Sequence, residues 1–230
     1  MAHAGLIVDN PVSGERFVFT TTAEDTGGEL LGFELEVPPG GRVPGGHVHP
    51  TQEERFEVTS GTMRFKKGLR WVTAESGDEV IVPAGTSHRF ANAGERPARV
   101  RVEVRPALRM EELFETVAAL AREGRTFPSG MPRPLELAMF MREFEPEVRA
   151  PVAPGLVRAV MSPLVWIARR RGLQARYRAM PDLAARTPTP SRPASPSMPG
   201  RRRGSTHPSP SRPGPSDRAR GVRSVGKRTE

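Results

Sequence analysis

The sequence contains no cysteine, and only one tyrosine and two tryptophans occur in its 230 residues. The absence of cysteine excludes disulfides, thiolate metal sites, iron–sulfur clusters and thiol nucleophiles. Any metal that the side chains bind must therefore be held by histidine and carboxylate groups. With five histidines in the whole chain, such a site would use most of the available imidazoles.

Long apolar runs are also missing. The most apolar stretch, 152–168, is interrupted by Arg158 and Pro163 and is shorter than the roughly 20 residues that a membrane span requires. The N-terminus has neither the charged region nor the apolar core of a signal peptide. We therefore expect a cytoplasmic protein with no transmembrane span.

The net charge of +9 is distributed unevenly along the chain. Residues 1–106 have 12 basic and 15 acidic side chains, and residues 107–150 have 6 and 8. Residues 151–186 have 7 and 1, and residues 187–230 have 10 and 2. Attraction to nucleic acid or another polyanion, which the overall charge favours, is thus expected mainly of the C-terminal third.

Composition and periodicity divide the chain into three parts. Residues 1–106 contain short alternating segments separated by Gly and Pro turns, which predict a β-barrel. Residues 107–186 predict a small helical extension, with helices from 110 to about 123, from 135 to about 144 and from 155 to about 171, the last bent or broken at Pro163. Residues 187–230 are rich in Pro, Ser and Arg and are expected to be a disordered basic tail with nonspecific affinity for polyanions.

Ten short strands are expected in the first part, and their alternation separates an apolar face from a charged face. The expected strands are 6–8, 16–21, 30–37, 47–49, 55–59, 62–66, 70–73, 79–82, 88–92 and 99–104. The apolar face includes Phe56, Val58 and Val100, and the charged face includes Arg55 and Arg99. The apolar face should form the interior.

Four potential metal ligands fall within residues 41–92. His47 and His49 are two residues apart on an expected strand, so both imidazoles point to the same face. Glu54 shares the inward face with Phe56, and His88 shares the face of Phe90. Three imidazoles and one carboxylate could therefore converge inside the barrel, a ligand set that suits divalent Fe, Mn, Ni, Cu, Zn or Co.

The two segments that carry these residues have fixed spacings. The first reads GRVPGGHVHPTQEERFEVTSG (41–61), and the second reads GDEVIVPAGTSHRFAN (77–92). They match the patterns G-x5-H-x-H-x4-E-x6-G and G-x5-P-x-G-x2-H-x3-N at every fixed position, and on these residues the sequence resembles the cupin superfamily. The resemblance implies an all-β barrel of the double-stranded β-helix or jelly-roll type. It also implies a metal bound by His47, His49, Glu54 and His88, and common formation of homodimers.

The interior around the metal is expected to be apolar, and it consists of Phe33, Phe56, Met63, Phe65, Val80, Val82 and Phe90. The nearest basic residues, Arg42 and Arg89, are expected on the exterior. This favours a small apolar or aromatic ligand over a carboxylate- or phosphate-bearing sugar. A metal-dependent, dioxygenase-like enzyme follows as one hypothesis, with Glu54 as the catalytic base; an isomerase-like activity is a variant of it. The alternative is a non-catalytic cupin that binds a small ligand or a partner.

Two neighbours of Glu54 and one basic segment leave alternatives open. Strand parity and the spacing to Gly61 favour Glu54 over Glu53 as the ligand, with Glu53 facing solvent. Gln52 could hydrogen-bond near the metal, although a residue in a turn is expected to be solvated. The segment 168–178, ARRRGLQARYR, is either the solvated end of a docked helix or a contact for anionic lipid or nucleic acid.

Overall fold

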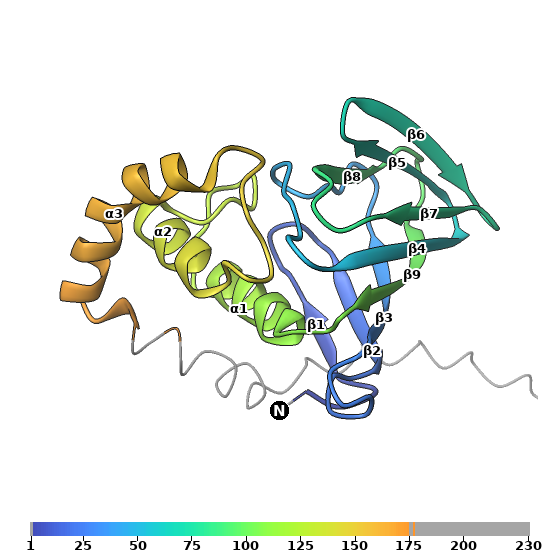
Figure 1. The fold of residues 1–230 in the computed structure, drawn as a ribbon. Helices are drawn as coiled ribbons and strands as arrows, with labels where there is room; N and C mark the ends of the chain where they lie inside the picture. The colour runs from blue at the N-terminus through green and yellow to red at the C-terminus, as the bar shows by residue number, and fades with distance from the viewer. Residues whose placement is uncertain (1, 175–176, 178–230) are drawn as a thin grey trace, which may run out of the picture. The chain divides into compact units, whose positions relative to one another are not determined.

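The computed structural model describes residues 2–174 and 177. Within them the chain forms two antiparallel sheets and three helices (Figure 1). The larger sheet has the strand order β1-β2-β3-β9-β4-β7, and the smaller has the order β6-β5-β8. The strands are β1 (Ile7–Asp9), β2 (Arg16–Thr21), β3 (Leu31–Val37), β4 (Glu53–Ser60), β5 (Thr62–Lys67), β6 (Arg70–Glu75), β7 (Glu79–Val82), β8 (His88–Asn92) and β9 (Ala98–Arg105).

The two faces that the alternation predicts are present in the central strands. Phe56 and Val58 on β4 are buried, as is Val100 on β9, whereas Arg55 and Arg99, which directly precede Phe56 and Val100, are exposed. The outward face is crossed by ion pairs between neighbouring strands, which are Arg55 with Glu79, Arg99 with Glu36 and Arg101 with Glu57. Exposed pairs of this kind contribute little to stability, so the buried face is what holds the sheet in place.

The helices follow the last strand. They are α1 (Met110–Arg122), α2 (Pro134–Glu143) and α3 (Pro154–Arg170). The α3 helix continues through Pro163, so it is not broken there, and a bend, the other expected alternative, stays a prediction. A proline inside a helix removes a single backbone donor, and the flanking turns keep their remaining hydrogen bonds. No helix in the described residues is long and apolar enough to cross a membrane.

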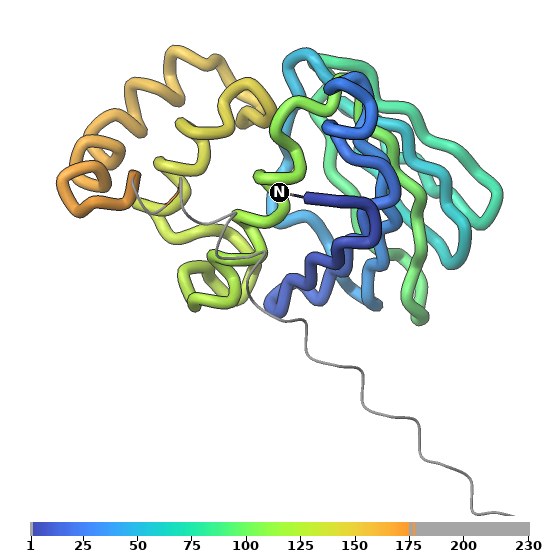
Figure 2. Tube along the Cα trace, turned by 90° about the horizontal axis from the view of Figure 1, so that it is seen from below, coloured from blue at the N-terminus to red at the C-terminus, as the bar shows by residue number. Residues whose placement is uncertain are grey.

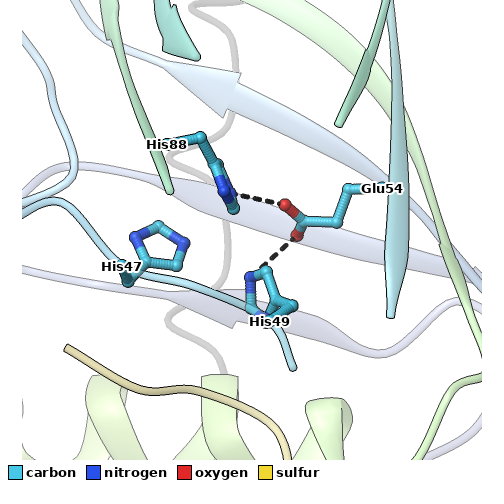
Figure 3. A group of neighbouring side chains, drawn as sticks. All are labelled: His47, His49, Glu54 and His88. Atoms are coloured by element: carbon cyan, nitrogen blue, oxygen red, sulfur yellow. Dashed lines mark ion pairs between the residues drawn. The ribbon is translucent and has the colours of Figure 1, made fainter. Parts of the chain in front are cut away.

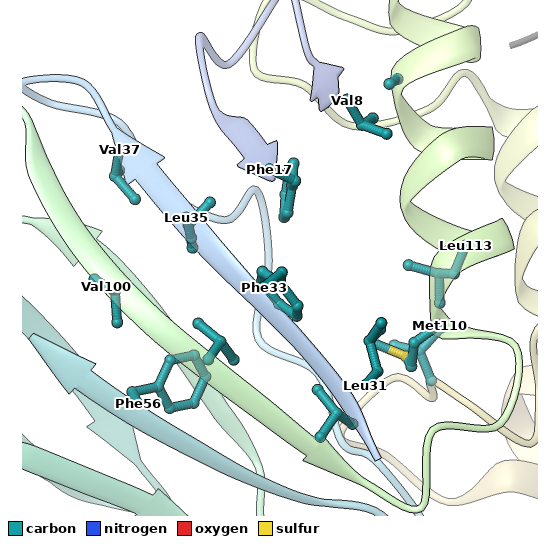
Figure 4. Close-up of a cluster of buried hydrophobic side chains, with 14 of the residues drawn as sticks. Val8, Phe17, Leu31, Phe33, Leu35, Val37, Phe56, Val100, Met110 and Leu113 are labelled. Carbon is teal, nitrogen blue, oxygen red and sulfur yellow. The ribbon is translucent and has the colours of Figure 1, made fainter. Parts of the chain in front are cut away.

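Helix α1 packs against the sheet through aromatic side chains. Phe114 stacks on Phe17 of β2 with ring centroids 4.7 Å apart and meets Phe33 of β3 at 5.1 Å. Figure 4 shows Met110 and Leu113 of α1 directed toward the same strands. Figure 2 shows the three helices gathered beside the sheets, from a second direction. The amphipathic face predicted for this helix therefore has its partner in the sheet.

The segment 47–49 differs from its prediction, because it does not form a strand of its own. His47 and Val48 make isolated bridges, the first to His88 and the second to Arg149, which lies beyond α2. Gly46 precedes this short stretch and Pro50, which has no backbone N–H, follows it, so the ladder cannot extend. The tail predicted for 187–230 and most of 175–186 lie outside the described residues.

Candidate metal centre

The structure brings His47, His49, Glu54 and His88 together (Figure 3). One ligand atom from each lies within 4.8 Å of those of the other three. His47 and His88 exchange both backbone hydrogen bonds of an antiparallel bridge, at 3.0 and 2.9 Å, which places their side chains on one face. His49 is two residues further along the extended chain, so it shares that face. Glu54 reaches the group from β4, where it is buried like Phe56.

Short distances separate these ligand atoms, yet most of them lack hydrogen bonds. His88 Nε2 lies 2.7 Å from Glu54 Oε2, and His49 Nε2 lies 3.4 Å from Glu54 Oε1. Within the described residues, His49 Nε2, His88 Nε2 and Glu54 Oε2 are nevertheless buried with no hydrogen-bond partner of acceptable geometry. Buried polar atoms without partners are rare in native proteins. Their convergence on one point fits the requirements of a bound cation.

The opposite ring nitrogen of each histidine faces a backbone carbonyl. The Nδ1–O distances are 3.3 Å from His47 to Gly45, 2.5 Å from His49 to Glu147 and 3.1 Å from His88 to Thr86. A carbonyl oxygen only accepts hydrogen bonds, so each Nδ1 must carry the hydrogen. This tautomer leaves the lone pair on Nε2 free to bind a metal.

The electrostatics of the group keep the carboxylate ionised between imidazoles. Burial, together with the neighbouring His88 and His49, lowers the pKa of His47 to about 3. Burial raises the pKa of Glu54, but the three histidines lower it by more, to about 2. Burial lowers the pKa of His88, but the adjacent Glu54 carboxylate raises it by more, and the net shift is upward. A metal binds an ionised carboxylate and a neutral imidazole, and these are the forms that Glu54 and His47 adopt here.

A cavity of about 520 Å³ adjoins the group, and His47, His49 and Glu54 form part of its wall. The rest of the wall is almost entirely apolar. Phe33, Phe56 and Phe90 line it, as predicted, but the other expected lining residues do not. These are Met63, Phe65, Val80 and Val82, which pack inside the hydrophobic core instead.

More than half of the lining residues come from beyond the strands, whereas the expected lining residues were all drawn from the strands. They include Phe114 and Val117 of α1, Phe140 of α2 and Val157 of α3. The helical spacing of the apolar residues in α1, at i and i+3, could have predicted this contribution, because an apolar helix face has to pack against another part of the protein. Arg149 also lines the cavity, whereas Arg42 and Arg89 are exposed, as expected.

The position of Gln52 differs from the expected one, which was a solvated turn. It is buried, and its Nε2 donates hydrogen bonds to the carbonyl oxygens of Pro106 at 2.9 Å and Ala107 at 3.1 Å. It thereby fixes the start of β4 to the chain that leaves β9, two residues before Glu54. The adjacent Glu53 is exposed, as expected.

Residues 33–104 match the family described as Cupin domain. Solved structures with a similar fold include a predicted oxalate decarboxylase from Thermotoga maritima (19% identity, TM-score 0.40, 46% of this chain and 98% of that chain). Another is the cupin domain of Schizosaccharomyces pombe Cnp3 (16% identity, TM-score 0.37, 40% of this chain and 61% of that chain). A third is a cupin-superfamily sugar phosphate isomerase from Silicibacter pomeroyi (23% identity, TM-score 0.36, 41% of this chain and 60% of that chain). For the latter two, the match spans less than two thirds of the other chain. No curated protein matches the chain in sequence. The match assigns residues 33–104, less than half of the chain, to a cupin domain.

Proposed function

We propose that this cupin holds a divalent transition metal and uses it to act on a small apolar or aromatic molecule bound in the adjoining cavity. One observation carries the proposal. Three imidazoles, each with Nδ1 against a carbonyl, converge with one carboxylate at the wall of an apolar cavity of about 520 Å³. This volume lies in the range of pockets that enclose small organic molecules.

The ligands in this proposal are His47, His49, Glu54 and His88. The ligand types are compatible with Fe, Mn, Ni, Cu, Zn or Co and do not select among them. When bound, such a metal supplies Lewis acidity that lowers the pKa of a substrate hydroxyl or enol and, for the redox-active metals, chemistry toward dioxygen.

The contribution of the chain itself is to bind, to exclude water and to accept a proton. The aromatic wall, including Phe33, Phe56 and Phe90, favours a flat apolar molecule and displaces water from it. The Glu54 carboxylate is the group placed to accept the substrate proton. The surrounding histidines lower its pKa, so it gains basicity when it turns away from them. In dioxygenase-like chemistry both atoms of dioxygen enter the product, so the substrate is the only electron donor required.

A binding protein without turnover is the second candidate, and the composition of the cavity wall favours it. Apart from His47, His49 and Glu54, the titratable side chains that line this cavity are Glu15 and Arg149. Burial raises the pKa of the Glu15 carboxyl, so it resists ionisation. Few groups are thus available for proton transfer away from the metal ligands.

Elemental analysis and oxygen uptake, measured on the same preparations, test both candidates. We expect about one metal ion per chain in the wild type and in Glu53→Gln, and at least a tenfold loss in Glu54→Gln. The Glu53 substitution is a matched control, because its carboxylate is exposed beside that of Glu54. Oxygen consumption with flavonols, β-diketones or catechols would support the enzyme. Stoichiometric ligand binding without oxygen uptake, with or without bound metal, would support the binding protein. Absence of both metal and ligand binding would refute both.

We also infer that the two sheets are the halves of a closed double-stranded β-helix. The exclusively antiparallel pairing supports this, as does the adjacency of β4 and β5, which continue from one sheet into the other through a turn at Gly61. A φ of +83° at Gly61, with a Cβ that would lie 2.8 Å from Ala98 Cα, makes this turn accessible to glycine alone.

A further inference from the structure

Helix α3 leaves much of its apolar surface uncovered. Leu156, Val160 and Trp166 are 61%, 60% and 58% exposed, and among its 17 residues Ala168 is the buried one. Leu156, Val160, Pro163 and Ile167 recur at i, i+4, i+7 and i+11, so they share one face of the helix. An apolar face of this kind marks an interaction site more often than an ordinary surface.

The charge along this segment of the sequence has a single sign. No acidic residue occurs between Glu147 and Asp182, and the same interval contains seven arginines. Arg170 lies over the Trp166 ring, with its guanidinium carbon 4.3 Å from the ring centroid. Arg158 pairs with Glu145 of the preceding segment at 2.5 Å. The surface therefore combines apolar side chains with arginines, the pattern that suits an anionic interface.

The uncovered face is continuous with the opening of the cavity. Val152, Leu156 and Val160 all line the cavity, and each is more than half exposed. Residues that belong both to the wall and to the surface must lie at the edge of the opening. The opening is thus bordered on this side by apolar side chains.

We propose that α3 and the preceding Val152 dock onto the surface of an anionic lipid bilayer, with the cavity opening directed toward the lipid. Apolar side chains would enter the boundary between headgroups and acyl chains, and the arginines would lie among the headgroup phosphates. This inference goes beyond the proposed metal chemistry, because docking requires neither a metal nor turnover.

Two other partners fit the surface less well. A second copy of the chain would bring two surfaces of the same positive charge together, and like charges across an interface oppose binding. A nucleic acid would pair with the arginines but would leave Leu156 and Val160 facing a polar backbone. An anionic bilayer satisfies both the apolar side chains and the charge.

Vesicle sedimentation with the full-length protein tests the proposal. The vesicles are phosphatidylcholine alone or an equal mixture with phosphatidylglycerol, in 0.1 and 0.5 M NaCl. The basic segment 187–230 is also expected to attract anionic lipid, and salt screens that attraction more than it weakens apolar insertion. We expect the double substitution Leu156→Ser and Val160→Ser to lower the partition coefficient on the mixed vesicles about tenfold at both salt concentrations. Leu69→Ser is the matched control, since Leu69 is 96% exposed in the turn between β5 and β6, and it should bind as the wild type does.

A fluorescence measurement gives an independent readout. Trp71→Phe leaves Trp166 as the one tryptophan, and its emission should shift to shorter wavelength on mixed vesicles. Wild-type binding by the double variant, or an unchanged Trp166 emission, would overturn the proposal. It would also be overturned if the double substitution altered dimerisation or nucleic-acid affinity and left vesicle binding intact. Circular dichroism and melting of each variant verify that the substitutions leave the fold unchanged.

Discussion

The Nδ1 atom of His49 lies 2.5 Å from the carbonyl oxygen of Glu147, a residue 98 positions further along the chain. His49 belongs to the candidate metal centre of the cupin domain, and Glu147 belongs to the segment between α2 and α3. The adjacent Val48 and Arg149 exchange backbone hydrogen bonds of 2.8 and 2.9 Å, which hold the two segments together. The helical part of the chain therefore takes part in orienting a ligand of the centre.

A first prediction concerns this backbone contact. Arg149→Pro removes the N–H that donates to Val48, whereas Arg149→Ala removes the same side chain and keeps the N–H. We expect metal affinity to fall about tenfold or more in the proline variant relative to the alanine variant, because His49 loses its fixed orientation. Competition with a chromogenic chelator measures the affinity. Equal affinities in the two variants would show that the contact is dispensable.

The second prediction separates the cavity from the metal centre. Val117→Trp places a large side chain in the cavity from α1, while the four metal-binding candidates stay untouched. We expect about tenfold weaker binding of an apolar fluorescent probe, with metal content unchanged. Leu69→Trp adds the same group at an exposed turn and should have no effect. Undiminished probe binding by the Val117 variant would place the probe elsewhere.

The pH dependence of stability gives a third prediction, from Glu115 of α1. Burial raises the pKa of its carboxyl from 4.5 to about 7, with Glu111 and Glu112 adding to the shift. The folded protein therefore holds this proton more tightly than the unfolded chain, and stability declines as pH rises from about 4.5 through 7. Glu115→Gln should stabilise the protein by about 1 kcal/mol at pH 8 and by much less at pH 4.

Thermal melting across this pH range measures the effect. Glu29→Gln is the control, because Glu29 is exposed, and its melting temperature should follow that of the wild type. If Glu115→Gln gave the same change in melting temperature at pH 4 and pH 8, the ionisation of Glu115 would not be the cause.

A fourth prediction addresses Gln52. Gln52→Met keeps the size of the side chain but removes the hydrogen bonds to the carbonyl oxygens of Pro106 and Ala107. We expect a loss of about 1–3 kcal/mol in the free energy of unfolding, because one buried and one partly buried acceptor lose their donor. Urea denaturation measures it. A variant as stable as the wild type would mean that water replaces the amide.

Local patterns account for what the sequence predicts correctly. The alternation along β4 and β9 requires only neighbouring residues, and so does the helical spacing of α1. The grouping of His47, His49, Glu54 and His88 also follows from strand parity and two motifs. The first two inferences depend on residues close together in the chain, and the third depends on the spacings within each of the two motifs.

The parts that could not be predicted depend on contacts between distant segments. The oxygen that faces His49 Nδ1 belongs to the backbone of Glu147, and every residue carries such a carbonyl. In the sequence, Gln52 cannot be told from any other polar turn residue. Its burial depends on the chain after β9, which packs over it. The prediction of the cavity lining was partly wrong for the same reason. The residues next to Met63 and Phe65 in the sequence do not show whether these side chains lie in the core or in the cavity wall.

The cavity wall is built from two separate parts of the chain, and this determines how its properties can be changed by substitution. The candidate metal ligands come from residues 47–88, whereas more than half of the wall comes from residues 110–161. Substitutions in the helices can thus alter the size and shape of the accepted molecule without replacing a ligand. Substitutions among the ligands can change the metal without reshaping most of the wall. The two properties can be varied one at a time in separate halves of the described chain.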